Sequence, residues 1–182
     1  WVDMAKEGWY SGDLHVHSPR VAPSQDEYIL TWAQAMDIHL TGVLSYADRR
    51  PEIFCPQARY GKTSRHQEGD YWLESGHEDP REDIAEQGHV TQLGIEKMVR
   101  DEGQYQLYDY VFDGVHTQGG LVGYTHLPWS GPFFRRQRPE LNPGWDVSIN
   151  VIRGKIDFMD ILEATTLGVE HYYDFLNLGV KL

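Results

Sequence analysis

Two histidines near the start of the chain are spaced so that they can share one metal ion. His15 and His17 lie in the segment GDLHVH (residues 12–17), whose apolar setting is typical of a β-strand. Side chains two positions apart on a strand point to the same face, so both imidazoles can offer a ring nitrogen to one cation. Nine histidines in 182 residues give about 0.4 such pairs by chance. The surroundings must therefore decide, and an exposed or hydrogen-bonded histidine is the alternative.

Further metal-ligating residue types follow other predicted strands. Apolar segments that read as strands adjoin a carboxylate or an imidazole: 40–46 lead to Asp48, 88–95 contain His89, and 121–125 are followed by His126. In parallel α/β sheets and barrels the functional site lies at the carboxyl ends of the strands. We therefore expect these side chains to gather at one edge of the sheet with His15 and His17.

Helical patterns alternate with these strands. Apolar periodicity and end signals predict helices over about 24–38, 105–119, 142–154 and 169–179, and a further strand over 156–162. Residues 51–87 are polar and lack clear periodicity, so we expect a long excursion there rather than a core element. The alternation predicts an α/β fold with parallel strands.

Composition limits the classes of partner. With 182 residues and 40% hydrophobic content, the chain can bury one substantial core. Its 28 acidic and 16 basic residues give a net charge of −12, which argues against nucleic acid or an anionic membrane as partner. No apolar run reaches the ~20 residues that span a bilayer. The single cysteine, Cys55, excludes an internal disulfide framework and a cysteine-rich zinc module. We expect a small-molecule substrate.

Four sequence elements together resemble a known family. They are GWYSGDLHVH at 8–17, GHE at 76–78, GHV at 88–90 and YTHLP at 124–128. With them the chain resembles the polymerase-and-histidinol-phosphatase (PHP) superfamily of metallohydrolases, and within it the carbaryl-hydrolase-like branch. The resemblance implies a distorted (β/α)7 PHP-type barrel of parallel strands with helices outside, which binds one to three divalent metal ions that activate water.

The resemblance also implies a ligand set. His15 and His17 match the first ligand pair, and Glu78 matches a carboxylate that bridges metal ions. His89 and His126 match two later imidazole ligands. Asp48 matches the acid of a Thr-Asp-His element, which reads Ala-Asp-Arg here, so the usual histidine of that element is missing.

The resemblance further predicts how the chain is organised. In relatives the final helix leads to a strand that ends in Gly-Thr-Asp and completes the metal site, whereas this chain stops at Leu182. We therefore expect residues 8–182 to form a PHP-like metallohydrolase domain that lacks its last strands. Residues 1–7 are expected to be the end of an upstream β-rich domain or a linker. Barrels of about 250 residues are usual for this type of architecture, so 182 residues are few for closure.

Two positions near Glu78 leave the choice of ligands open. Glu74 competes with Glu78 for the role of carboxylate ligand, and the motif match favours Glu78. His77 is either a loop residue or an additional ligand.

Other residues are expected to support the ligands or the substrate. Asp13 is expected to orient the imidazole of His15 or His17, because a metal-ligating histidine usually donates the N–H of its other ring nitrogen to a carboxylate or carbonyl. The alternative is that Asp13 is a turn residue. Arg49 and Arg135 follow strands that carry ligands and are candidates to bind an anionic group of the substrate.

These residues predict a hydrolytic metal centre. Imidazoles and carboxylates without thiolates suit zinc, manganese or iron, and such ions activate water for attack on a phosphoester, an amide or a carbamate-type ester. The main alternative is a non-catalytic module that keeps the fold and binds metal or ligand. A cupin also uses a His-x-His pair on a strand, but it requires an all-β pattern and a glutamate about four residues later, where this chain has Glu27 ten residues after His17.

Overall fold

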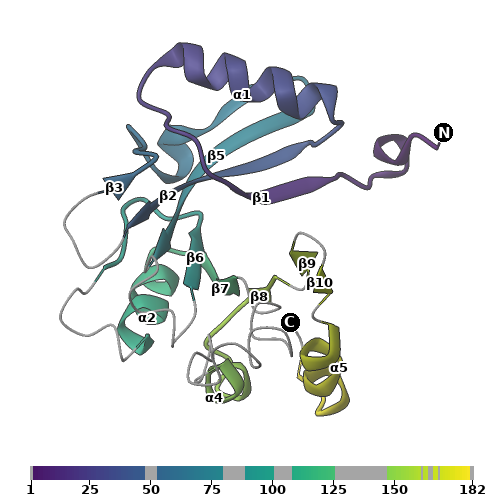
Figure 1. Cartoon of the computed structure of the whole chain (residues 1–182), viewed down its shortest axis with the longest axis vertical. Coiled ribbons are helices and arrows are strands. Elements are labelled where there is room, and N and C mark those ends of the chain that lie inside the picture. The colour runs from purple at the N-terminus through teal and green to yellow at the C-terminus, as the bar shows by residue number, and fades with distance from the viewer. Residues whose placement is uncertain are drawn as a thin grey trace.

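A mixed sheet, curled into half a barrel, forms the centre of the computed structural model (Figure 1). The structure describes residues 2–47, 53–79, 89–100, 108–125, 147–160, 162–163, 166–167 and 169–180. The strand order along the sheet is β1 (Gly12–Val16), β2 (Leu40–Ala47), β5 (Tyr71–Asp79), β6 (His89–Leu93), β7 (Leu121–Thr125) and β8 (Phe158–Met159). Two short strands extend it, with β3 (Ile53–Phe54) pairing with β2 and β4 (His66–Glu68) pairing with β5. A separate pair joins β9 (Leu162–Glu163) to β10 (Thr166–Leu167).

Helices cover the sheet on two sides. In Figure 1, α1 (Pro23–Ala35) lies across one end, while α2 (Asp109–Thr117), α4 (Val147–Ile152) and α5 (Val169–Asn177) lie along the other. Two 3-10 helices complete the described elements, η1 (Met4–Glu7) and η2 (Gly61–Ser64). None of the described helices is long and apolar enough to cross a membrane.

The strands are not all parallel, so the expectation of a parallel sheet is wrong in part. β1, β2 and β5 run parallel, but β6 is antiparallel to both β5 and β7. Only residues 80–88 connect β5 to β6, which is shorter than the dozen or more residues that a parallel crossover needs. Because β6 is reversed, its first residue, His89, lies at the same edge as the carboxyl ends of β5 and β7.

The expectation of an excursion over 51–87 is wrong, because the central strand β5 lies within it. This strand was not predicted from the sequence because its carboxyl half, SGHED, is polar and yet buried. Asp79 forms an ion pair with Arg100, and His77 shares a hydrogen bond with Ser45 on β2. Internal partners thus replace the apolar pattern that normally identifies a buried strand.

Arg20 fastens the segment before β5 to the body of the protein. Its buried guanidinium donates to Asp26 at 2.6 Å, to the Ser75 hydroxyl at 2.8 Å and to the Ser64 carbonyl at 2.8 Å. The backbone of Arg20 also pairs with the backbone of Pro56 and Ala58. One side chain thus joins α1, η2 and β5.

Two apolar clusters support the sheet. The first joins α1 to β2 and β5 and contains Ile29, Leu30, Val43 and Leu73. Tyr28 and Trp32 of α1 are exposed, as is Met36 directly after it. The second surrounds α2, β6 and β7, and its largest fully buried side chains are Tyr108, Tyr124 and Phe112. Gly123 on β7 allows β8 to approach closely, since a Cβ there would overlap the carbonyl oxygen and ring of Phe158. Both clusters hold the strand ends in fixed relative positions.

Candidate metal centre

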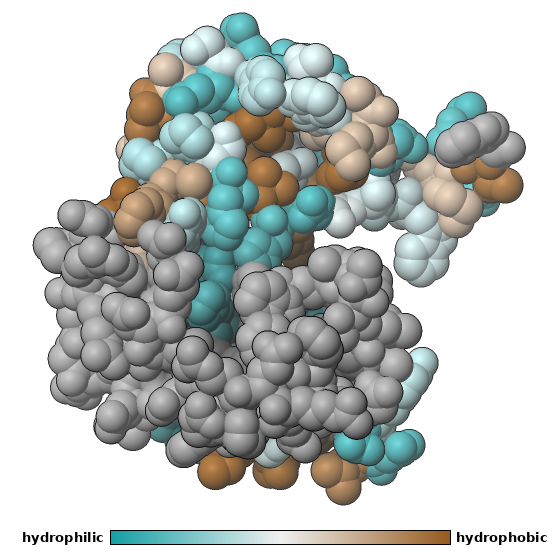
Figure 2. All heavy atoms as spheres, viewed as in Figure 1, coloured by the Kyte–Doolittle hydropathy of each residue, from teal (hydrophilic) through white to brown (hydrophobic). Residues whose placement is uncertain are grey.

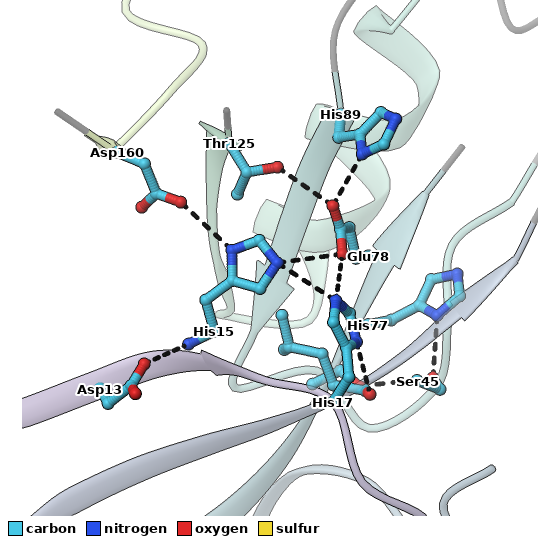
Figure 3. Close-up of polar contacts among 11 residues, drawn as sticks. Asp13, His15, His17, Ser45, His77, Glu78, His89, Thr125 and Asp160 are labelled. Carbon is cyan, nitrogen blue, oxygen red and sulfur yellow. Dashed lines mark hydrogen bonds and ion pairs between the residues drawn. The ribbon is translucent and has the colours of Figure 1, made fainter. Parts of the chain in front are cut away.

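Three donor atoms converge at one edge of the sheet (Figure 3): they belong to His15 on β1, His17 directly after β1, and Glu78 on β5. The His15 Nε2 atom lies 3.2 Å from His17 Nε2 and 3.1 Å from Glu78 Oε2, and the last two atoms are 2.7 Å apart. The Glu78 side chain is 5% exposed, against 23% for His15 and 32% for His17. The cluster is therefore anchored in the interior by its carboxylate and open to solvent on the imidazole side.

The backbone of the strands brings these side chains together. Glu78 lies near the carboxyl end of β5 and pairs with Tyr46 on β2, while Val16 of β1 pairs with Val43 on the other side of β2. The register of β1 shifts between Asp13 and Val16, which is the irregularity of a bulge. Bulges re-aim side chains, and here the shifted segment contains His15.

Each imidazole is held by a hydrogen bond at its other ring nitrogen. His15 Nδ1 lies 3.3 Å from Asp160 Oδ2, and His17 Nδ1 lies 3.2 Å from the Leu44 carbonyl oxygen. Both acceptors require a proton on Nδ1. Such bonds fix the ring orientation and direct Nε2 toward the cluster, as in metal sites where the outer nitrogen is held by a carboxylate or carbonyl.

The second oxygen of Glu78 is held as well. Glu78 Oε1 accepts a hydrogen bond from His89 Nδ1 at 2.8 Å and from the Thr125 hydroxyl at 3.4 Å. His89 and Thr125 face each other across the β6–β7 pair. These bonds fix the plane of the carboxylate and leave Oε2 directed at the two imidazoles.

The metal-free cluster strongly favours a positive charge on His15. Burial alone would lower its pKa, but hydrogen bonds and charge from Asp160 and Glu78 outweigh burial and raise the pKa of His15 to about 10. A proton on Nε2 then lies between Glu78 and His17. A divalent cation bound by the same donors would take the place of that proton.

The spacing of the donors fits metal coordination. Zinc bonds of about 2.0–2.1 Å at the tetrahedral angle separate neighbouring ligand atoms by about 3.3 Å. The observed separations of 3.2, 3.1 and 2.7 Å are close to one face of such a polyhedron. The chemistry of the set, two imidazoles and a carboxylate, suits zinc, manganese or iron.

Three further positions named from the sequence lie outside the three-donor cluster. The Asp13 carboxylate accepts a hydrogen bond from the backbone N–H of His15 at 3.1 Å, and Asp160 is the acid on the His15 imidazole. Glu74 pairs with Arg65 at 2.6 Å, away from the cluster. His77 faces the other side of β5, where it is fully buried and hydrogen-bonded to Ser45.

Four other candidates lie outside the described residues. They are Asp48, Arg49, His126 and Arg135. The backbone leading to two of them is described: β2 ends at Ala47 and β7 ends at Thr125, and Thr125 contacts Glu78.

Sequence reasoning did not single out Asp160 or Thr125. Thr125 directly precedes the histidine that was chosen, and its hydroxyl lies on the face of β7 that Glu78 meets. Asp160 follows the two-residue strand β8, which is too short for a clear period-2 pattern. The one feature of the sequence that could have indicated Asp160 is an acidic residue at the end of a short apolar segment.

Hydrophilic side chains gather in the middle of the face shown in Figure 2, around β1 and β5 in the matching view of Figure 1. Polar atoms at a solvent-reachable strand edge are the usual setting of a functional site in α/β folds.

This fold has a solved neighbour. It is a two-domain protein from Bacteroides vulgatus that is described as containing a predicted PHP-like metal-dependent phosphoesterase, with 14% sequence identity and a TM-score of 0.58. The match covers 94% of this chain and 50% of the neighbour, so the chain spans about half the length of that protein. No family model and no curated protein matches the chain. The likeness shows the fold.

Proposed function

We propose that the chain is a metal-dependent hydrolase that cleaves a phosphoester with a water molecule activated by a divalent metal ion. The observation that carries this proposal is the convergence of His15 Nε2, His17 Nε2 and Glu78 Oε2 within 4.8 Å of one another. The description of the Bacteroides vulgatus neighbour favours a phosphoester over an amide or carbamate-type ester.

His15, His17 and Glu78 would hold the ion, which we expect to be zinc, manganese or iron. When bound, such an ion lowers the pKa of a coordinated water toward 7 and polarises the phosphoryl or carbonyl oxygen under attack. One to three ions are proposed. Asp48, His89 and His126 are the proposed ligands for any beyond the first.

The residues around the three proposed ligands hold them in position. Asp160 and the Leu44 carbonyl hold the protons of the two Nδ1 atoms, so that both Nε2 lone pairs are available for a cation. His89 and Thr125 donate to Glu78 Oε1, which keeps the carboxylate in place. The buried position of Glu78 limits the competition of water for this ligand.

The substrate is proposed to be a small molecule with an anionic group. Arg49 and Arg135 are the proposed contacts for that group, because a guanidinium can bind two phosphate oxygens at once. The net charge of −12 makes nucleic acid and anionic membranes poor partners.

Hydrolysis assays on the metal-stripped chain test this proposal. The substrates are p-nitrophenyl phosphate, bis-p-nitrophenyl phosphate and a phenyl carbamate, each measured with added manganese, zinc or ferrous iron. We expect metal-stimulated hydrolysis of a phosphoester that His17→Ala and Glu78→Gln abolish. His116→Ala serves as a matched control, since His116 is a half-buried histidine paired with Asp157 away from the centre.

Two results would contradict the proposal. Equal rates in the wild-type chain and in both centre variants would mean that the centre takes no part in hydrolysis. Tight metal binding without turnover of any of the three substrates would favour a binding module that retains the fold.

A further inference from the structure

Asp160 lies outside the three-donor cluster, and its carboxylate reaches the imidazole of His15. Its Oδ2 atom lies 3.3 Å from His15 Nδ1, and 145 positions separate the two residues in sequence. The opposite nitrogen of the same ring, Nε2, is the one directed at His17 and Glu78. Asp160 and the cluster thus hold His15 from its two sides (Figure 3).

The backbone places Asp160 in this position. The Asp160 N–H donates to the Tyr124 carbonyl at 3.0 Å, and the preceding residue, Met159, pairs with Tyr124 in the β7–β8 ladder. Tyr124 is fully buried in the core beneath the sheet. Asp160 directly follows β8, and its backbone hydrogen bond ties it to β7; a group that orients another side chain needs such an anchor.

The two histidines differ in what holds them. A carbonyl dipole, that of Leu44, accepts from His17, whereas a full negative charge accepts from His15. A carboxylate on the outer nitrogen increases the basicity of the inner one. It also adds an acidic group, so that the Glu78 and Asp160 carboxylates can together match the charge of a divalent cation.

We propose that Asp160 is a positioning residue for the metal centre, which fixes the Nδ1–H tautomer of His15 and strengthens its Nε2 atom as a ligand without contacting the ion. This proposal rests on the proposed function. It assigns to Asp160 the task that the sequence suggested for Asp13, whose carboxylate instead binds the backbone N–H of His15.

Zinc-binding isotherms of the metal-stripped chain provide the first readout. Asp160→Ala should weaken zinc binding by about 10–100-fold, the usual cost of removing such an outer partner. Asp160→Asn should cause a smaller loss, because its amide oxygen still accepts the Nδ1 proton but carries no charge. Asp157→Asn is the matched control, since Asp157 precedes β8 and pairs with His116 at 2.9 Å in the same kind of contact; it should bind zinc like the wild type.

The tautomer of His15 provides a second readout, which a merely structural role would not change. In a chain labelled with ¹⁵N-histidine and loaded with zinc, the wild type and Asp157→Asn should show a hydrogen-bonded Nδ1 proton on His15. Asp160→Ala should lose it. Circular dichroism of the near-isosteric Asp160→Asn variant checks that the fold is retained.

The outcomes separate this inference from the proposed function. Zinc affinity within twofold of the wild type in Asp160→Ala, with the Nδ1 proton retained, would overturn the inference alone. Loss of a whole zinc equivalent while His15, His17 and Glu78 still coordinate would also overturn it, because Asp160 would then be a ligand. A wild-type chain that binds no zinc would overturn the proposed function together with this inference.

Discussion

Metal binding should release a proton from His15, and the structure gives the size of this effect. Hydrogen bonds to Asp160 and Glu78 outweigh burial and raise the pKa of His15 to about 10 in the metal-free protein. At pH 7.5 a group of this pKa is almost fully protonated, whereas an unperturbed histidine of pKa 6.5 carries only about 0.1 proton. A cation must displace that proton, because a metal-ligating imidazole is deprotonated at the nitrogen that binds.

The raised pKa of His15 determines how metal affinity and stability change with pH. Because the metal-free state holds the proton up to about pH 10, metal affinity should rise about tenfold per pH unit between pH 7 and 9 from this group alone. Without metal, the same proton stabilises the fold fully below about pH 6.5, and this contribution is lost as the pH rises through about 10.

Titration calorimetry in buffers of different ionisation enthalpy counts the released protons. At pH 7.5 His15 should contribute about one proton per metal ion in the wild-type chain. Asp160→Asn removes one of the two carboxylates, so the pKa of His15 and the number of released protons should both fall. A wild-type count near 0.1 proton, unchanged in Asp160→Asn, would mean that His15 is not protonated in the metal-free protein.

Three further predictions concern stability. Arg20→Met should lower the free energy of unfolding by about 3 kcal/mol in urea titrations, because it leaves the partners of a buried guanidinium without their donor. A loss below about 1 kcal/mol would contradict the anchoring role of Arg20. Burial lowers the pKa of His77 to about 3, so the free energy of unfolding should fall as the pH drops from about 6.5 toward 3. The loss at pH 5 should be about 2 kcal/mol, and His77→Gln should flatten this acid dependence. Gly123→Ala should destabilise the chain by about 1–3 kcal/mol in thermal melts, whereas Gly12→Ala, whose Cβ would meet its nearest atom at 3.5 Å, should be nearly neutral.

Local patterns were sufficient to predict much of the architecture. The first helix was expected over about 24–38 and is α1, Pro23–Ala35, and the strand expected over 40–46 is β2, Leu40–Ala47. The last helix begins at Val169 as its periodicity indicates. β2 buries an apolar run, and α1 buries Ile29, Leu30 and Ala33, which are features that sequence patterns report. In α5 the pattern located the helix, although Tyr173 and Leu176 are exposed.

β5 could not be predicted in this way, because its fit depends on partners distant in sequence. His77 needs Ser45, and Asp79 needs Arg100, before their burial is favourable. Glu78 was therefore assigned from a motif and placed in a loop, whereas the structure places it inside a strand. The direction of β6 was missed for a related reason, since local patterns do not report which strand pairs with which.

The histidine pair at the end of β1, with His15 in the strand and His17 directly after it, was the part of the candidate site that local spacing could indicate. His89 was expected at the site because it was placed on a parallel strand, and it reaches Glu78 because β6 is antiparallel and begins at that edge. Asp160 meets His15 across 145 positions of sequence, a contact that only the folded sheet creates.

The most direct test of the central claim is the metal content of the chelator-stripped chain after equilibrium dialysis against buffered zinc. We expect at least one tightly bound ion in the wild type and in His116→Ala, and its loss when His15 and His17 are both replaced by alanine. Equal zinc content in the wild-type chain and in the double variant would contradict it.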